Sequence, residues 1–131
     1  PPVAQAAGLK AAIGFIVDLG FDSIRNHEAE LTRIALDRLD KEMDVEIYGP
    51  LNGESRAGVI AFNLHGVHPH DVAQVLNESG IAVRAGHHCT QVLHSRLGQQ
   101  STVRMSVGVY NTEEEILRLV SSLQHVRDLL Q

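Results

Sequence analysis

The only cysteine of the chain, Cys89, lies in the stretch RAGHHCT, and its neighbours favour a reactive thiol. Two histidines precede the cysteine directly, and Arg84 lies five residues before it. The thiolate is the nucleophilic form of cysteine, and cationic neighbours stabilise it. A buried structural thiol is the ordinary alternative, because free cysteine is among the most buried residue types. The stretch is not flanked by a run of apolar residues, which argues against a buried thiol. The pattern alone nevertheless leaves both interpretations open.

Two arginines occur in segments whose other residues are mostly apolar or small. Arg84 belongs to IAVRAG, and Arg104 belongs to TVRMSVGVY. An arginine on a strand is usually a solvated surface charge. A planar guanidinium is nevertheless suited to paired hydrogen bonds with a carboxylate. A nucleophilic sulfur together with two arginines would suit a small anionic substrate such as an amino acid.

The histidines suggest metal binding as an alternative. Imidazole and thiolate side chains are common zinc ligands. The spacing here matches no well-known structural zinc pattern, and histidines at the start of a helix more often serve turns and caps. We therefore expect no metal site. The two groups concerned are His65, His68 and His70 in HGVHPH, and His87, His88 and His94 around Cys89.

Length, charge and composition exclude several classes of protein. A chain of 131 residues can form one domain with a substantial core. The net charge of −5 and the absence of a basic stripe argue against a nucleic-acid partner. No apolar run approaches the ~20 residues of a membrane span, and no signal-peptide pattern opens the chain. A single cysteine fits a reducing compartment, so we expect a cytoplasmic protein with no membrane partner.

Apolar periodicity predicts four helices. Gly20 and Gly80 are typical helix ends, and Asp22 or Ser23 can cap the second helix. A capping box that includes Thr112 begins the last helix. The apolar stripe of this helix ends at Leu130. The predicted helices span about 3–19, 22–42, 69–79 and 111–130.

Four further segments are apolar or alternating enough to be strands. In the last of them Thr102, Arg104 and Ser106 share one face, and valines and a methionine share the other. Residues 87–97 should form a loop or a short helical turn. The order of elements favours an α+β fold with an antiparallel or mixed sheet of about four strands and helices packed on one side. The predicted strands span 45–49, 59–64, 81–86 and 102–110.

Three stretches together resemble the C-terminal region of SufS-type (group II) cysteine desulfurases: GIAVRAGHHCTQVL, VRMSVGVYNTEEEI and GVHPHDVAQVL. These enzymes belong to the class V aminotransferase family, which includes selenocysteine lyases, and the resemblance covers essentially the whole chain. It implies the small C-terminal domain of a fold-type I, pyridoxal-phosphate-dependent transferase. Residues 1–20 would form the connecting helix from a missing large domain, and residues 21–131 the small domain.

The resemblance also implies a reaction. The family uses pyridoxal 5'-phosphate to convert L-cysteine into L-alanine and a persulfide, which passes to an acceptor protein for iron–sulfur cluster assembly. Cys89 would be the attacking thiolate, Arg104 would hold the substrate carboxylate, and Arg84 would be the second substrate-site arginine. His87 and His88 would position the loop and tune the thiol. The parent enzyme would be a homodimer.

The chain also departs from the family pattern. Nothing matches the family's cofactor lysine and its His-Lys motif, and Lys10 and Lys41 lie outside any matching motif. The proline common after HHCxQ is Val92 here. We therefore expect a fragment that binds no cofactor and is inactive alone. Two alternatives stay open: a cofactor-independent sulfur carrier or interaction module that uses Cys89, and a Cys/His metal-binding domain.

Overall fold

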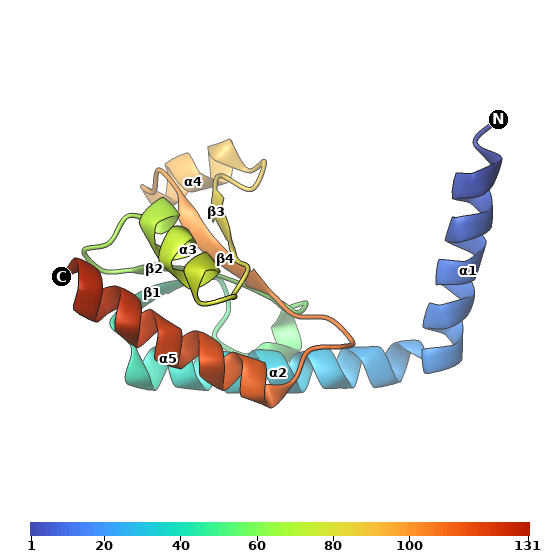
Figure 1. The fold of residues 1–131 in the computed structure, drawn as a ribbon, viewed down its shortest axis with the longest axis horizontal. Coiled ribbons are helices and arrows are strands. Elements are labelled where there is room, and N and C mark those ends of the chain that lie inside the picture. Colours follow the sequence, from blue (N-terminus) through green and yellow to red (C-terminus); the bar gives the residue numbers. More distant parts are fainter.

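A computed structural model describes all 131 residues, apart from the side chain of Glu54. The described residues form five α-helices and one four-stranded sheet, arranged as in Figure 1. The helices are α1 (Val3–Leu19), α2 (Phe21–Glu42), α3 (Pro69–Glu78), α4 (Gln91–Leu97) and α5 (Glu113–Leu130), and a 3₁₀ turn spans Gly53–Ser55. The strands are β1 (Val45–Tyr48), β2 (Val59–Leu64), β3 (Arg84–Gly86) and β4 (Thr102–Ser106).

The sheet has the strand order β1-β2-β4-β3, and every neighbouring pair is antiparallel. Helices α2, α3 and α5 pack together on one side of this sheet (Figure 1). The predicted α+β fold is therefore confirmed, with an antiparallel rather than a mixed sheet. The side chains on the opposite side of the central strands are not covered by these helices.

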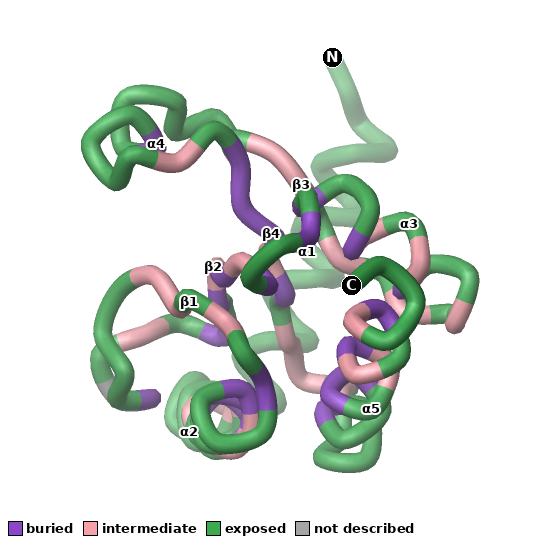
Figure 2. The backbone as a smooth tube through the Cα atoms, turned by 90° about the vertical axis from the view of Figure 1, so that its left-hand side faces the viewer, coloured by how far each residue is buried: buried purple, intermediate pink, exposed green. Residues whose placement is uncertain are grey.

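The core lies between the sheet and these three helices (Figure 2). Ile60 and Phe62 of β2 and Val103 of β4 are fully buried, and they alternate with residues of the opposite face. From the helices, Leu39 and Leu123 are equally buried. Burial of each large apolar side chain contributes about 1.5–3 kcal/mol to folding, so this core fixes the sheet whose other face carries polar residues.

Strand β1 ends one residue earlier than the sequence predicted, and β3 and β4 are shorter by several residues. The segment 81–83 is not a strand, because the backbone N–H of Ile81 closes the end of α3 by donating to the Leu76 carbonyl at 2.9 Å. Strand β4 ends at Ser106, because Gly108 and Asn111 form a local turn. In that turn the Gly108 N–H donates to Asn111 Oδ1 at 2.8 Å, and the Asn111 N–H donates to the Gly108 carbonyl at 3.1 Å.

Two details of the helices also differ from the prediction. Neither Asp22 nor Ser23 caps α2, which begins at Phe21 with Gly20 as its cap. Gly20 has a φ of 81°, so it ends α1 and turns the chain directly into α2. Leu130 is 42% exposed and lies outside the core, since it ends α5 beyond the last packed turn.

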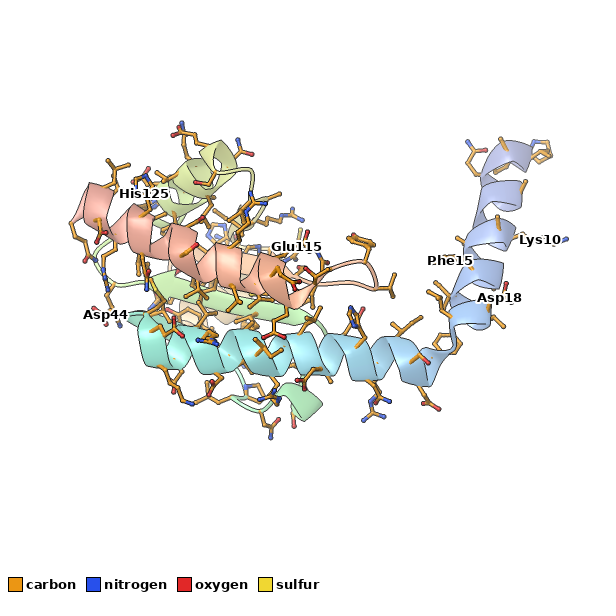
Figure 3. All side chains as sticks on the ribbon, turned by 60° about the horizontal axis from the view of Figure 1, so that its bottom comes forward. Lys10, Phe15, Asp18, Asp44, Glu115 and His125 are labelled. Atoms are coloured by element: carbon orange, nitrogen blue, oxygen red, sulfur yellow. The ribbon has the colours of Figure 1, made fainter. Side chains whose placement is uncertain are left out.

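Helix α1 stands apart from the packed domain. No residue of α1 is buried, although it has many apolar side chains, and Figure 3 shows this helix, with Phe15 on it, standing apart from the sheet and core. Among the described residues, no single helix has the length and apolar character needed to cross a membrane. Helices α1 and α2 would meet that requirement only as a pair, and they meet at an angle of 77°.

Candidate active site

Two arginines lie opposite each other on the uncovered face of the sheet. Arg84 of β3 and Arg104 of β4 are direct partners in the antiparallel ladder, so their side chains leave the sheet on the same face. Among the described residues, neither guanidinium forms an ion pair with a carboxylate. The Nε atom of Arg104 is buried and has no hydrogen-bond partner. Such an unpaired cationic pair is suited to bind a carboxylate.

Cys89 lies at the tip of a tight turn between β3 and α4. Gly86 ends β3 with a φ of 130°, which residues with a side chain rarely adopt, and it turns the chain away from the strand. His88 and Cys89 follow as the central residues, with φ values of 52° and 63°, as in a type I′ turn. The Thr90 N–H closes the turn onto the His87 carbonyl at 2.8 Å. The thiol is therefore exposed.

This turn needs support from its neighbours. A non-glycine residue with positive φ costs about 1–2 kcal/mol, and two such residues follow each other here. His88 provides one contact, because its Nε2 lies 3.0 Å from both the backbone oxygen and Oγ1 of Thr102. Thr102 and Arg104 are two residues apart on β4 and share a face. The contact thus fixes the Cys89 turn on the arginine side of the sheet.

The arginines also affect the charge of His88. Burial lowers the pKa of His88, the hydrogen bond to Thr102 opposes that change, and the charges of Arg104 and Arg84 add to the lowering. The Nδ1 atom of His88 is buried without a hydrogen-bond partner. The imidazole beside Cys89 is therefore neutral near pH 7, and the positive charge in this region belongs to the arginines.

The second predicted loop residue, His87, contributes mainly through its backbone. Its carbonyl accepts hydrogen bonds from both the N–H and the Oγ1 of Thr90, while its ring is exposed. That ring meets the ring of His94 edge-on, with 5.6 Å between the centroids. His94 itself is buried and lies within hydrogen-bond distance of Thr90 and Thr102.

In the sequence, His94 is recognisable only as one of a group of histidines around Cys89. Its four-residue spacing from Thr90 at the start of α4 is the local signal that places the two side chains on one side of a helical turn. The contact with Thr102 depends on how β4 returns to the loop, and no local pattern reveals it.

A polar network occupies the β1 end of the same face. The Asn63 side-chain amide donates to Tyr48 Oη at 3.3 Å and to the Ser101 carbonyl at 3.0 Å, and Tyr48 donates to the Glu46 carboxylate at 2.7 Å. Burial and then the Glu46 hydrogen bond raise the pKa of Tyr48, so its hydroxyl stays protonated. Asn63 Oδ1 remains buried without a partner. Together with Arg104 Nε, it leaves unused hydrogen-bonding capacity on this face.

The described side chains do not form a complete site for pyridoxal phosphate. A Schiff base with that cofactor needs a lysine, and the two lysines lie on helices away from Arg104. Lys10 projects from α1 (Figure 3), and Lys41 on α2 is paired with Asp37 at 2.6 Å. A cofactor of this kind would have to be held by residues outside this chain.

The other histidine group serves local structure. His68 caps α3, and its Nδ1 accepts the backbone N–H of His70 at 3.3 Å while the two rings stack. His65 lies 3.8 Å from the Asp44 carboxylate. Among the described residues, no group of three or more His, Cys, Asp or Glu side chains is arranged to hold a metal ion.

Comparison with known proteins places this arrangement in a family. The family model for aminotransferase class-V matches residues 1–119. The chain belongs to the class-V aminotransferase family. Within that family, the chain is 45% identical to a cysteine desulfurase of Haloferax volcanii over 98% of its own length. The chain spans about 30% of the length of that relative.

Solved structures agree with this placement. The chain superimposes on the apo structure of a cysteine desulfurase from Thermococcus onnurineus with a TM-score of 0.94 and 39% identity. The match covers 99% of this chain and 32% of that one. The cysteine desulfurase CsdA of Escherichia coli, in an S-sulfonic acid form, gives a TM-score of 0.91 at 32% identity, covering all of this chain and 32% of its own. The predicted resemblance to cysteine desulfurases is thus confirmed for the fold and the family.

Proposed function

We propose that this chain supplies the sulfur nucleophile and the carboxylate-binding arginines of a SufS-type cysteine desulfurase whose substrate is L-cysteine. The observation that best supports the proposal is the contact of His88 with Thr102, which holds the exposed Cys89 turn on the side of the sheet where Arg84 and Arg104 are unpaired. The similar proteins described above are cysteine desulfurases, and they support the same assignment.

The proposed reaction uses each of these groups once. Arg104 and Arg84 bind the carboxylate of L-cysteine through charge-assisted hydrogen bonds. The Cys89 thiolate then attacks the substrate sulfur, so that a sulfur–sulfur bond forms while the substrate carbon–sulfur bond breaks. The electron pair of the broken bond stays with the substrate carbon, which takes up a proton. L-Cysteine and the thiol are thereby converted into L-alanine and a persulfide on Cys89.

The remaining parts of the machinery belong to the rest of the protein. Pyridoxal phosphate, when bound there, supplies the electron sink for this chemistry. Residues 1–20 would connect that larger part to the small domain of residues 21–131, which agrees with the absence of buried residues in the apolar helix α1. We further propose that the complete enzyme is a cytoplasmic homodimer.

The exposure of Cys89 supports a second step, the delivery of sulfur. A persulfide at the tip of a turn is open to attack by the thiolate of another protein. We propose that the acceptor is a protein of iron–sulfur cluster assembly. A selenocysteine lyase would use the same residues, and a comparison of the rates with L-cysteine and L-selenocysteine decides between them.

The role of Cys89 is tested in the full-length protein. The Cys89→Ser variant should lose at least about 1000-fold in alanine and persulfide formation, because the nucleophile is absent. Its cofactor absorbance should be unchanged. Val92→Ser, a substitution three residues away at an exposed position, is the matched control and should retain activity. Normal alanine production by Cys89→Ser would refute the proposal.

A second experiment separates an enzyme fragment from a sulfur carrier. The 131-residue chain, incubated with L-cysteine and pyridoxal phosphate, should produce no alanine. Mass spectrometry after incubation with an active desulfurase then shows whether Cys89 gains one sulfur atom. A stoichiometric gain would favour the carrier alternative, and no gain would favour a fragment that needs its own cofactor domain.

A further inference from the structure

We infer that His94 is a positioning residue that holds the Cys89 turn against strand β4, an inference that rests on the proposed role of Cys89. His94 is only 4% exposed, whereas its neighbours on α4, Val92 and Leu93, are more than half exposed. A short helix has therefore buried an imidazole and left apolar side chains outside. Buried polar groups require hydrogen-bond partners, and the partners of His94 determine its role.

The contacts of His94 fix its tautomer. Its Nδ1 lies 3.1 Å from the backbone oxygen of Thr90, and a carbonyl can only accept, so Nδ1 bears the proton. In the neutral ring Nε2 is then an acceptor, and Thr102 Oγ1, at 3.2 Å, donates to it. The ring thus joins the residue that follows Cys89 to the strand that bears Arg104.

The neighbouring hydrogen bonds in the loop also have defined directions. The single hydroxyl proton of Thr102 is used on His94, so His88 Nε2 must donate to the Thr102 oxygens, both at 3.0 Å. The hydroxyl of Thr90 donates to the His87 carbonyl at 2.7 Å, which leaves its oxygen free to accept from His94. Every proton has one consistent position, and the hydrogen bonds run from His88 through Thr102, His94 and Thr90 to His87.

This network holds the chain on both sides of the exposed Cys89. The residue before Cys89 and the residue after it are both tied to Thr102, the first directly and the second through His94. The two positive-φ residues of the turn are thereby held in place on the side of the sheet with Arg84 and Arg104. His94 acts on the reaction only through the position of Cys89, because its ring nitrogens are both occupied by Thr90 and Thr102.

The first test measures the tautomers directly in the 131-residue chain. Nitrogen–proton correlation spectra of ¹⁵N-labelled histidines should show His94 protonated at Nδ1 and His88 protonated at Nε2 near neutral pH. His94→Leu identifies the His94 signals, and His125→Leu, at an exposed site on α5, is the control. A His94 ring protonated at Nε2 would overturn the inference.

The second test measures the consequence for the turn. In Thr102→Val, which keeps the shape but removes the hydroxyl, the Thr90 amide should exchange with solvent at least about tenfold faster, whereas Thr102→Ser should restore its protection. In the full-length protein the same valine variant should lower kcat about tenfold with little change in KM, since misplacement of a reacting group slows the chemical step. His94→Leu should reproduce both effects.

The outcomes separate this inference from the proposed function. Unchanged amide exchange and unchanged kcat in Thr102→Val and His94→Leu would refute the positioning role, even if Cys89→Ser is inactive. If instead Cys89→Ser remains fully active while amide exchange responds as expected, the proposed function fails and the network is shown to hold the turn alone.

Discussion

The two faces of the sheet are built by the same strands and have opposite character. On β4, Val103 and Met105 are buried against the helices, whereas Arg104 lies on the other face with an unpaired buried Nε atom. Alternation along a strand sends successive side chains to opposite faces. One short strand therefore contributes both to the core and to the candidate site. The core face stabilises the fold, and the uncovered face keeps polar groups available, as the proposed substrate site requires.

Buried polar atoms without hydrogen-bond partners also distinguish the two faces of the sheet. Among the described residues, three buried side-chain atoms lack partners: Asn63 Oδ1, His88 Nδ1 and Arg104 Nε. Asn63 and Arg104 are on the uncovered face, and His88 contacts that face through Thr102. Buried polar atoms without partners reduce stability, and they are expected where a ligand completes them. Substitutions on the two faces should therefore separate stability from activity.

The largest expected effect on stability is on the core face. Phe62→Ala on β2 removes a fully buried ring and should reduce the free energy of unfolding of the 131-residue chain by about 3–5 kcal/mol. Val59→Ala, on the opposite face of the same strand and 39% exposed, should cost less than about 1 kcal/mol. Urea unfolding followed by circular dichroism measures both. Equal losses would contradict the proposed separation of the two faces.

The next effect concerns activity on the uncovered face. Arg104→Gln should lower kcat/KM of the full-length protein for L-cysteine about 10–100-fold, because a charge-assisted hydrogen bond to the carboxylate is lost. Arg104→Lys should recover only part of this loss, since an ammonium cannot form the paired contact. The free energy of unfolding should change by less than about 0.5 kcal/mol. Full activity of Arg104→Gln would remove Arg104 from the substrate site.

Much of the difference between the two faces of the sheet could be predicted from the sequence. The alternation in TVRMS predicts Val103 and Met105 on one face and Arg104 on the other. The single cysteine among polar residues indicates the loop as a candidate site. These features depend on residue type and local period, which a sequence displays directly. The capping box of Thr112 and Glu115 was predictable for the same reason, and the Thr112 N–H donates to the Glu115 carboxylate at 3.1 Å.

Other features depend on contacts between distant segments. The direct pairing of Arg84 with Arg104 is a matter of strand register, which no short pattern specifies. The burial of His94 requires β4 to return beneath α4, so the sequence showed only a histidine near a cysteine. The missed start of α2 has a different cause. Asp22 and Ser23 are good capping residues, but Gly20 already turns the chain one residue before the helix begins.

A smaller effect is expected in the titration of His88. Its pKa is lowered in the folded chain, so its NMR titration midpoint should lie below 6.5, the value for an exposed imidazole. Since the unfolded chain binds the proton more readily, stability is complete above about pH 6.5 and declines as the pH falls through the folded pKa. Arg104→Gln should raise the midpoint in part, because burial remains the main cause. A midpoint at or above 6.5 would contradict this account of the loop.

The smallest effect tests whether the arginine pair itself costs stability. Arg84 and Arg104 carry like charges at directly opposed positions, an arrangement that destabilises a β-ladder by a few tenths of a kcal/mol. Arg84→Gln should therefore raise the free energy of unfolding of the 131-residue chain slightly, and added salt should reduce the gain because it screens the repulsion. The same variant should weaken L-cysteine binding by the full-length protein. Loss of stability in Arg84→Gln would show that Arg84 serves the fold, and the contrast between the two faces would then fail at β3.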